Sequence, residues 1–303
     1  MSAELKPIND YSKIFNHLIK QTSDYICNNN LKCMVLGISG GIDSTVVAAI
    51  CHEVSKRSGI PLIGRSLPTK HNKENEITAA NLVGNAFCND YKEVPIMYPY
   101  SSFLEFLDAA GDATTKLSEG NIQARLRMIY LYNLAGIHKG LVMDTDNLTE
   151  NNLGYFTIHG DVGDFNPIGG LWKTEIFELA KWLFNQYKDS DYTQLPKAEA
   201  MWASLQLKPT AGLGITNNDL EELGAESYEQ VDHILKEILV WKKSKLRQDF
   251  ESFKEINLEN FLTEQQILDI PTNRVAEVSK RHFASEFKRK QLPIKIQRYE
   301  LFI

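Results

Sequence analysis

The 303-residue sequence lacks the features of a membrane protein, a disulfide-rich protein or a nucleic-acid-binding protein. No apolar run approaches the roughly 20 residues that cross a bilayer, and the polar residues 1–10 do not resemble a signal peptide. The four cysteines have no CxxC or Cys/His ligand spacing, which favours small buried hydrophobes in a reduced protein. A net charge of −6 argues against nucleic acid as the default partner. We therefore expect a cytoplasmic protein that binds neither membranes nor nucleic acid.

Apolar periodicity alternates between helix-like and strand-like segments over the first half of the chain. Helical spacing covers residues 11–28, 44–55, 72–87 and 121–138, and strand-like runs cover 32–38, 60–67, 91–96 and 141–145. We expect Asp10 and Asn72 to cap two of these helices and Gly59 to end a third. This alternation predicts an α/β fold, a doubly wound parallel sheet with helices on both faces.

The alternation stops after about Asp161. Residues 160–170 are dense in Gly, Asp, Asn and Pro, which predicts a loop, and a helix is expected at 174–185. We expect one domain over residues 1–303. Its expected parts are an α/β core at about 11–187, a mobile active-site segment at about 188–214 and a helical C-terminal part at 215–303.

The hexapeptide SGGIDS, which begins at Ser39, lies between a predicted strand and a predicted helix. Gly40 and Gly41 let the backbone turn tightly and approach a ligand without a Cβ in the way. The hydroxyls of Ser39 and Ser44, with the free N–H groups of a helix N-terminus, suit pyrophosphate. A carboxylate repels phosphate, so Asp43 makes sense there if Mg²⁺ lies between them. The alternative is a plain glycine turn that caps a helix.

The hexapeptide has no lysine and so differs from the GxxxxGK[ST] loop of enzymes that cleave the γ-phosphate. It resembles the signature of the N-type ATP pyrophosphatases, which attack the α-phosphorus of ATP and release pyrophosphate. That group includes NAD synthetases, GMP synthetases, asparagine synthetases and tRNA thiolases. This one motif therefore implies a reaction type but no substrate.

Further runs, in the same order along the chain, resemble those of NAD synthetases. GNIQARLRM at 120–128 is similar to the family's GN-x-x-AR-x-RM helix, and DTDNLTE at 144–150 to its G-T-D-x-x-x-E segment. The second run follows a predicted strand, at the sheet edge where ligands bind. Shorter matches are GYFT at 154–157, GD at 160–161, KPTA at 208–211, LGIT at 213–216 and EFKR at 286–289. Taken alone, the two longer runs could be a solvated helix and an acidic loop with a capping box.

This resemblance, which spans residues 32 to about 289, implies roles for particular side chains. The implied catalytic residues are Asp43, Lys173 and Asp161, and the implied metal ligands are Asp43, Glu150 and Asp161. The implied ATP-binding residues are Ser39, Gly40, Gly41, Ser44, Thr145, Lys173 and Thr210. The implied substrate-binding residues are Arg125, Asn121, Asp164 and Lys288.

The resemblance also implies the reaction: amidation of deamido-NAD to NAD with ammonia and ATP through an adenylated intermediate, with Mg²⁺ as cofactor and a homodimer as the assembly. The match takes up nearly the whole chain, which predicts use of free ammonia rather than glutamine. Single residues depart from the family pattern at Asp144, Ile158, Gly212 and Phe287, and the run DVGD at 161–164 is shorter than the family's GDGG-x-D. The rival hypotheses are another adenylating amidoligase or thiolase, and a nucleotide-binding module without catalysis.

Overall fold

The structure is a computed structural model that describes residues 7–208, 219–248, 256–264, 267, 269–289 and 294–295. Its strands are β1 (Met34–Gly37), β2 (Leu62–Ser66), β3 (Asp90–Glu93), β4 (Leu141–Val142), β5 (Phe165–Asn166) and β6 (Ile294–Lys295). Its first seven helices are α1 (Tyr11–Asn28), α2 (Ile42–Ser58), α3 (Glu74–Phe87), α4 (Met97–Ala110), α5 (Lys116–His138), α6 (Leu148–Leu153) and α7 (Lys173–Lys188). A 3₁₀ turn (Tyr192–Gln194) then precedes α8 (Leu195–Gln206), α9 (Asp219–Leu223), α10 (Tyr228–Gln248), α11 (Leu258–Glu264), α12 (Thr272–Ala284) and α13 (Glu286–Arg289).

The centre of the fold is a parallel sheet with the strand order β3-β2-β1-β4. Met34 of β1 is in register with Leu62 of β2 on one side and with Leu141 of β4 on the other. A helix connects each strand to the next along the chain, as parallel pairing requires. The predicted doubly wound α/β fold is confirmed.

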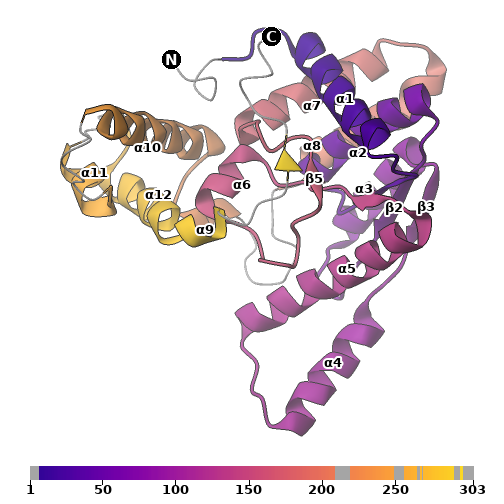
Figure 1. Ribbon diagram of the computed structural model, residues 1–303, viewed down its shortest axis with the longest axis horizontal. Coiled ribbons are helices and arrows are strands. Elements are labelled where there is room, and N and C mark those ends of the chain that lie inside the picture. Colours follow the sequence, from indigo (N-terminus) through magenta and orange to yellow (C-terminus); the bar gives the residue numbers. More distant parts are fainter. Residues whose placement is uncertain are drawn as a thin grey trace.

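Side chains of β1 alternate between the two faces of the sheet, because successive residues of a strand point in opposite directions. Met34 and Leu36 pack in the cluster that contains buried residues of α1, α2, α7 and α8. Val35 packs with Met128 and Leu131 of α5 on the opposite face. Figure 1 shows these layers, with α4 and the N-terminal part of α5 extending away from the sheet. The sheet is therefore covered on both faces and exposes its strand ends for a site.

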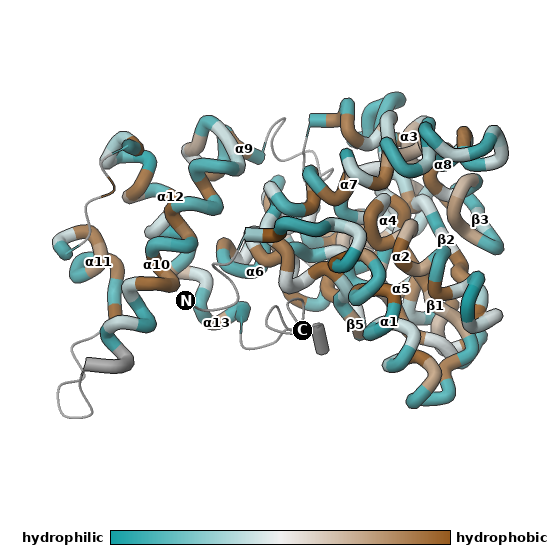
Figure 2. Tube along the Cα trace, turned by 90° about the horizontal axis from the view of Figure 1, so that it is seen from above, coloured by the Kyte–Doolittle hydropathy of each residue, from teal (hydrophilic) through white to brown (hydrophobic). Residues whose placement is uncertain are grey.

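The C-terminal helices form a second apolar cluster beside the core. Val231, Ile234 and Ile238 of α10 are fully buried there, together with Val278 of α12. Trp172, which directly precedes α7, belongs to the same cluster and so joins it to the α/β core. Figure 2 shows α10, α11 and α12 to one side of the core, with α6 between. The expected division into core, mobile segment and helical part stays a prediction.

Several elements differ from the sequence expectations. α4 was not predicted, because its residues are apolar on more than one side and only Tyr100 is buried. α3 begins at Glu74 after Lys73, and the side chain of Asn72 instead accepts a hydrogen bond from the backbone N–H of Thr69 (2.9 Å). The prediction that Asn72 caps this helix was therefore wrong, whereas Asp10 does cap α1.

The segment expected to be irregular and mobile contains the regular helix α8. Ala198, Ala200 and Met201 of this helix are buried in the main core, and Ser204 donates or accepts a hydrogen bond with Thr45 (2.7 Å). Its small apolar residues alternate with Lys and Glu, which made it look polar along the sequence.

No helix within the described ranges is both long enough and apolar enough to span a membrane.

Candidate functional site

A cavity of about 610 Å³ opens at the carboxyl edge of the central sheet. The residues that follow three strands line it: Ser39 after β1, Leu67 after β2 and Thr145 after β4. Helix α5 and the segment around Phe156 supply another wall, and the C-terminal helices contribute Arg281. Ligands bind at this edge in open α/β sheets, so the cavity is the candidate site.

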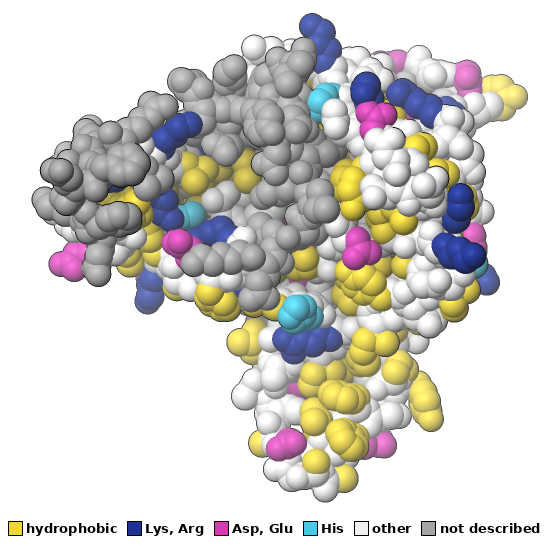
Figure 3. Space-filling view, in the orientation of Figure 1, with side chains coloured by type: hydrophobic (Ala, Val, Ile, Leu, Met, Phe, Trp, Pro, Cys, Tyr) yellow, Lys and Arg dark blue, Asp and Glu magenta, His cyan; other side chains and the backbone are white. Residues whose placement is uncertain are grey.

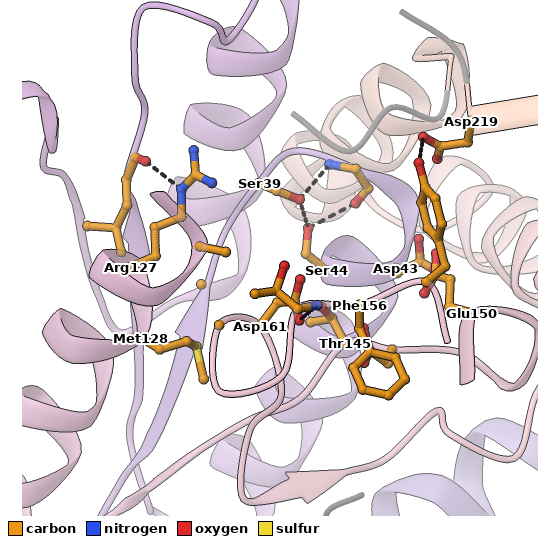
Figure 4. Close-up of a pocket in the computed structure, with 18 of the residues that line it drawn as sticks. Ser39, Asp43, Ser44, Arg127, Met128, Thr145, Glu150, Phe156, Asp161 and Asp219 are labelled. Carbon is orange, nitrogen blue, oxygen red and sulfur yellow. Dashed lines mark hydrogen bonds between the residues drawn. The ribbon is translucent and has the colours of Figure 1, made fainter. Parts of the chain in front are cut away.

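The SGGIDS loop forms the floor of this cavity, and its two glycines do different things. Ser39, Gly41 and Ser44 line the cavity, and the hydroxyls of Ser39 and Ser44 lie 3.0 Å apart (Figure 4). Gly41 precedes α2, so the free N–H groups of that helix face the same space. Gly40 does not line the cavity: it has φ +84°, and a Cβ there would lie 2.5 Å from the carbonyl oxygen of Glu76. Gly40 lets the loop pack closely against α3, and its implied role in binding ATP stays a prediction.

Gly40→Ala should destabilise the fold by roughly 2–4 kcal/mol, since it adds both a strained φ and a backbone clash. Gly59→Ala is the matched control, because Gly59 has φ +74° but nothing within 4 Å of an added Cβ. Urea denaturation of both variants measures the difference. Equal losses in the free energy of unfolding would show that the contact with α3 contributes nothing.

Lys173, the first residue of α7, joins the loop to α6. Its Nζ donates to Asp43 Oδ2 (2.5 Å) and to Glu150 Oε1 (2.9 Å), and its side chain is only 3% exposed. Burial alone would lower the pKa of Lys173, but the two carboxylates raise it well above its usual value. The lysine is therefore a permanent buried cation at the floor of the cavity.

Asn147 caps helix α6 and also holds the side chain of Asp43 in place. Its Oδ1 accepts from the backbone N–H of Glu150 (3.0 Å) and so caps α6. Its Nδ2 donates to Asp43 Oδ1 (2.8 Å), whereas Lys173 donates to the other oxygen of that carboxylate. Both oxygens of Asp43 are thus held in place within the protein.

More carboxylate side chains than basic side chains line the cavity. Burial raises the pKa of Glu150 and of Asp161 to about 7, and burial with the neighbouring Asp144 raises the pKa of Asp146 well above its usual range. The Oδ2 atom of Asp146 is buried and has no hydrogen-bond partner among the described residues. This excess of negative oxygen ligands fits a divalent cation. Across the described parts of the chain, however, no three His, Cys, Asp or Glu side chains converge on one metal position, so phosphate oxygens would have to complete the coordination.

Asp161 forms no three-carboxylate cluster with Asp43 and Glu150 among the described residues, and its implied role as a metal ligand stays a prediction. Its Oδ1 accepts from the backbone N–H of Thr157 (2.7 Å), and it lies beside Thr145 in Figure 4. In the same view Asp43 and Glu150 lie together, apart from Asp161.

The implied substrate-binding residues separate into two groups. Asn121 and Lys288 line the cavity, and Lys288 Nζ donates to the carbonyl oxygens of Gly154 (2.9 Å) and Phe156 (2.5 Å). Asp164 does not line the cavity: it accepts from the hydroxyl of Tyr132 (3.1 Å) and from the backbone of β4. Because this loop contains several glycines and aspartates, the sequence did not indicate that Asp161 rather than Asp164 faces the cavity.

Arg125 is also outside the cavity, on the exposed side of α5, where it donates weakly to the carbonyl oxygen of Ile158 (3.4 Å). Arg127 lines the cavity instead and donates to the carbonyl oxygen of Leu67 (3.0 Å). Residues two positions apart in an α-helix point in directions about 200° apart around its axis. Only one of Arg125 and Arg127 can therefore face the cavity. Burial lowers the pKa of Arg127 to about 10, still high enough to keep it charged at neutral pH.

Thr210 and Gly212 lie outside the described residues, so their expected roles stay predictions. Phe287 is 59% exposed and does not line the cavity.

Sequence reasoning missed a cluster at the mouth of the cavity. The hydroxyl of Tyr155 lies 2.9 Å from both Asp219 Oδ1 and Glu222 Oε2, and the guanidinium of Arg281 lies 4.7 Å from its ring centre. Figure 4 shows Asp219 and its hydrogen bond on the same side of the cavity as Glu150. The cluster is built from α9, α12 and the segment after α6, so no single sequence window contains it.

A protein-family model and curated relatives match most of the chain. The model of the NAD synthase family matches residues 14–292. The chain is 32% identical over 252 residues to the NH(3)-dependent NAD(+) synthetase of Methanocaldococcus jannaschii, covering 82% of this chain and 88% of that protein. It is 36% identical over 209 residues to the enzyme of that name from Thermoplasma acidophilum, covering 68% of this chain and 77% of that protein.

Solved structures give the same fold. The NMN synthetase of Francisella tularensis superposes with a TM-score of 0.70 at 26% identity and covers 93% of this chain and 97% of its own. An NH3-dependent NAD synthetase from Campylobacter jejuni superposes with a TM-score of 0.65 at 24% identity, covering 96% of this chain and 100% of its own. With the family model matching nearly the whole chain and the curated relatives aligned over most of it, the chain belongs to the NAD synthase family.

Proposed function

We propose that this protein amidates deamido-NAD to NAD with ammonia and ATP, releasing AMP and pyrophosphate. The observation that supports this best is Lys173, which joins Asp43 of the glycine loop to Glu150 at the floor of the cavity. A buried cation beside an anion-binding loop suits a reaction whose leaving group is pyrophosphate. Family membership makes the carboxylate of deamido-NAD the expected nucleophile at the α-phosphorus.

Each side chain of the floor has a role in this proposal. Ser39, Ser44 and the N–H groups at the start of α2 bind phosphate oxygens, and Lys173 offsets the negative charge that develops on departing pyrophosphate. Asp43 and Glu150 would hold Mg²⁺ together with the ATP phosphates. When bound, this ion neutralises phosphate charge and makes the α-phosphorus more electrophilic.

Ammonia attacks the adenylated acid and must lose a proton. Asp161 is the proposed acceptor, because it lines the cavity and burial raises its pKa to about 7. Asp146 also lines the cavity, and its buried Oδ2, which has no hydrogen-bond partner among the described residues, is available to hydrogen-bond with ammonia.

A homodimer is part of the proposal. Several large apolar side chains of α4 and α5 are exposed, and Figure 3 shows hydrophobic side chains gathered on the part of the molecule that these helices form. The exposed residues are Tyr98, Phe103, Phe106, Leu117, Ile129, Tyr132 and Ile137. Exposed apolar side chains that gather on one part of a molecule favour association. Light scattering should give the mass of a dimer, and Ile129→Glu should shift it toward a monomer.

The activity assay should include a second carboxylic acid as substrate. The Francisella protein, with which this chain has a TM-score of 0.70, is an NMN synthetase, and NMN is a mononucleotide rather than a dinucleotide. Nicotinate mononucleotide is the corresponding acid. The chemistry at the α-phosphorus would be unchanged, and only the recognition of the distal nucleotide would differ.

Incubation with ATP, Mg²⁺, ammonium and deamido-NAD should yield AMP, pyrophosphate and NAD in equal amounts. Chelation of Mg²⁺ should abolish turnover, and glutamine in place of ammonium should not support it. Chromatography of the products measures all three. A higher kcat/KM with nicotinate mononucleotide than with deamido-NAD would transfer the assignment to that substrate. ADP and inorganic phosphate as products would contradict the proposal, because they mean γ-phosphate cleavage.

A further inference from the structure

The first turn of α7 carries Lys173, yet the N-cap residue of this helix has no side chain that could accept from that turn. Trp172 at the N-cap position offers no side-chain acceptor. The backbone N–H of Lys173 donates instead to the hydroxyl of Thr149 on α6 (2.8 Å), and the backbone N–H of Thr174 donates to Asp232 Oδ2 on α10 (3.1 Å). The start of α7 is therefore held by two other helices, one of them from the C-terminal cluster.

Asp232 is the residue at which these contacts meet. Its Oδ1 accepts from the hydroxyl of Thr149 (2.5 Å), and its Oδ2 also accepts from the hydroxyl of Thr174 (2.7 Å). Thr149 immediately precedes Glu150, and Thr174 immediately follows Lys173. One carboxylate thus holds Thr149 and Thr174, the chain neighbours of the two residues whose Nζ and Oε1 atoms meet at 2.9 Å.

A buried carboxylate at position 232 costs free energy of folding, and what distinguishes it from an uncharged cap is that it has two acceptor oxygens. Asp232 is only 1% exposed, and burial raises its pKa to about 6 despite the two threonine hydroxyls. An uncharged cap would avoid that cost, although the positive end of the helix dipole offsets part of it. A single hydroxyl could not accept from three donors on two elements, whereas the two oxygens of Asp232 do.

Helix α10 makes a second approach to the same lysine. Tyr228 lies one turn before Asp232, on the same side of the helix, and its ring centre is 5.5 Å from Lys173 Nζ. The hydroxyl of Tyr228 points toward Asp219 at the cavity mouth (3.4 Å). One face of α10 therefore contacts both the backbone and the side chain at the start of α7.

We propose that Asp232 is a positioning residue for the adenylation step: it holds α6 and α7 so that Lys173 and Glu150 keep their alignment toward the ATP phosphates. The proposal rests on the role given above to Lys173. Reacting groups displaced by about 1 Å can lose on the order of 10²-fold in rate, so the effect belongs in kcat rather than in the binding of ATP.

Asp232→Asn tests this, since the amide keeps the size but loses the charge and one acceptor. We expect kcat for pyrophosphate–ATP exchange to fall about 10- to 100-fold, with the KM for ATP within threefold of wild type. Glu226→Gln is the matched control: Glu226 precedes α10, is exposed and pairs with Arg274 (3.2 Å) away from the cavity. It should behave as wild type.

A double-mutant cycle separates positioning from simple stabilisation. If Asp232 acts through Lys173, Asp232→Asn should cost less than threefold in a Lys173→Gln background. Losses that multiply would overturn the proposal, as would an unchanged kcat in Asp232→Asn. Thr174→Ser and Thr174→Val provide the test if Asp232→Asn fails to fold: serine should retain kcat, and valine should lower it. Wild type that exchanges no pyrophosphate with either nucleotide acid would instead refute the proposed function.

Discussion

Lys173→Met is expected to lower kcat by on the order of 10³-fold or more, because it removes the only side-chain cation held between the glycine loop and α6 in the described structure. Pyrophosphate would then depart without its charge being offset, while the apolar replacement occupies a similar volume. Asp43 and Glu150 would be left side by side. Glu150, whose pKa burial already raises to about 7, would hold its proton to a higher pH.

The measurement is pyrophosphate release under saturating ATP and acid substrate. Lys197→Met is the matched control, since Lys197 is also buried (8% exposed) but donates to Gln194 (3.0 Å) and lies outside the cavity. The control should keep wild-type kcat. If Lys173→Met stays within tenfold of wild type, the assignment of Lys173 to the leaving group is wrong.

Asp43→Asn should also lower kcat by roughly 10³-fold while the protein remains folded. A neutral amide is a poor ligand for Mg²⁺ opposite phosphate, and it also loses the ionic contact with Lys173. Part of the loss should be recovered at high Mg²⁺, because weaker coordination raises the concentration needed for half-maximal rate.

A titration of Mg²⁺ against rate checks this second expectation. Asp10→Asn provides the control: Asp10 also lies at a helix N-terminus, but it only caps α1, where asparagine caps equally well. Activity of Asp43→Asn within a few-fold of wild type at ordinary Mg²⁺ would remove Asp43 from the proposed metal site.

Local sequence patterns predicted the sheet and most helices that pack on it. The buried strand at Met34–Gly37 and the helix ended by Gly59 were recognisable because burial and glycine each leave a signature within a few residues. Helix α8 was missed because its buried positions are small residues such as Ala200, which periodicity hardly distinguishes from surface alanine. α4 was missed for the opposite reason, since its exposed residues include Phe106 and Tyr98.

The site was predictable to the level of motifs, and less so to the level of side-chain direction. The SGGIDS loop and Lys173 lie together as the resemblance implied. The resemblance could not say that Arg127 rather than Arg125 faces the cavity, since that depends on how α5 is rotated against the sheet. Contacts such as Tyr155 with Asp219 join segments 64 positions apart and leave no local trace.

Asn147 restricts which substitutions position 147 can accept. Helix stability alone would accept aspartate or serine there, because both cap helices about as well as asparagine. Neither aspartate nor serine can accept from the Glu150 backbone with one atom and donate to Asp43 with another, as the amide does. Aspartate would place a second negative charge 2.8 Å from Asp43 Oδ1. A screen for folded variants should therefore accept several residues at this position, whereas a screen for growth that depends on the enzyme should accept asparagine almost exclusively.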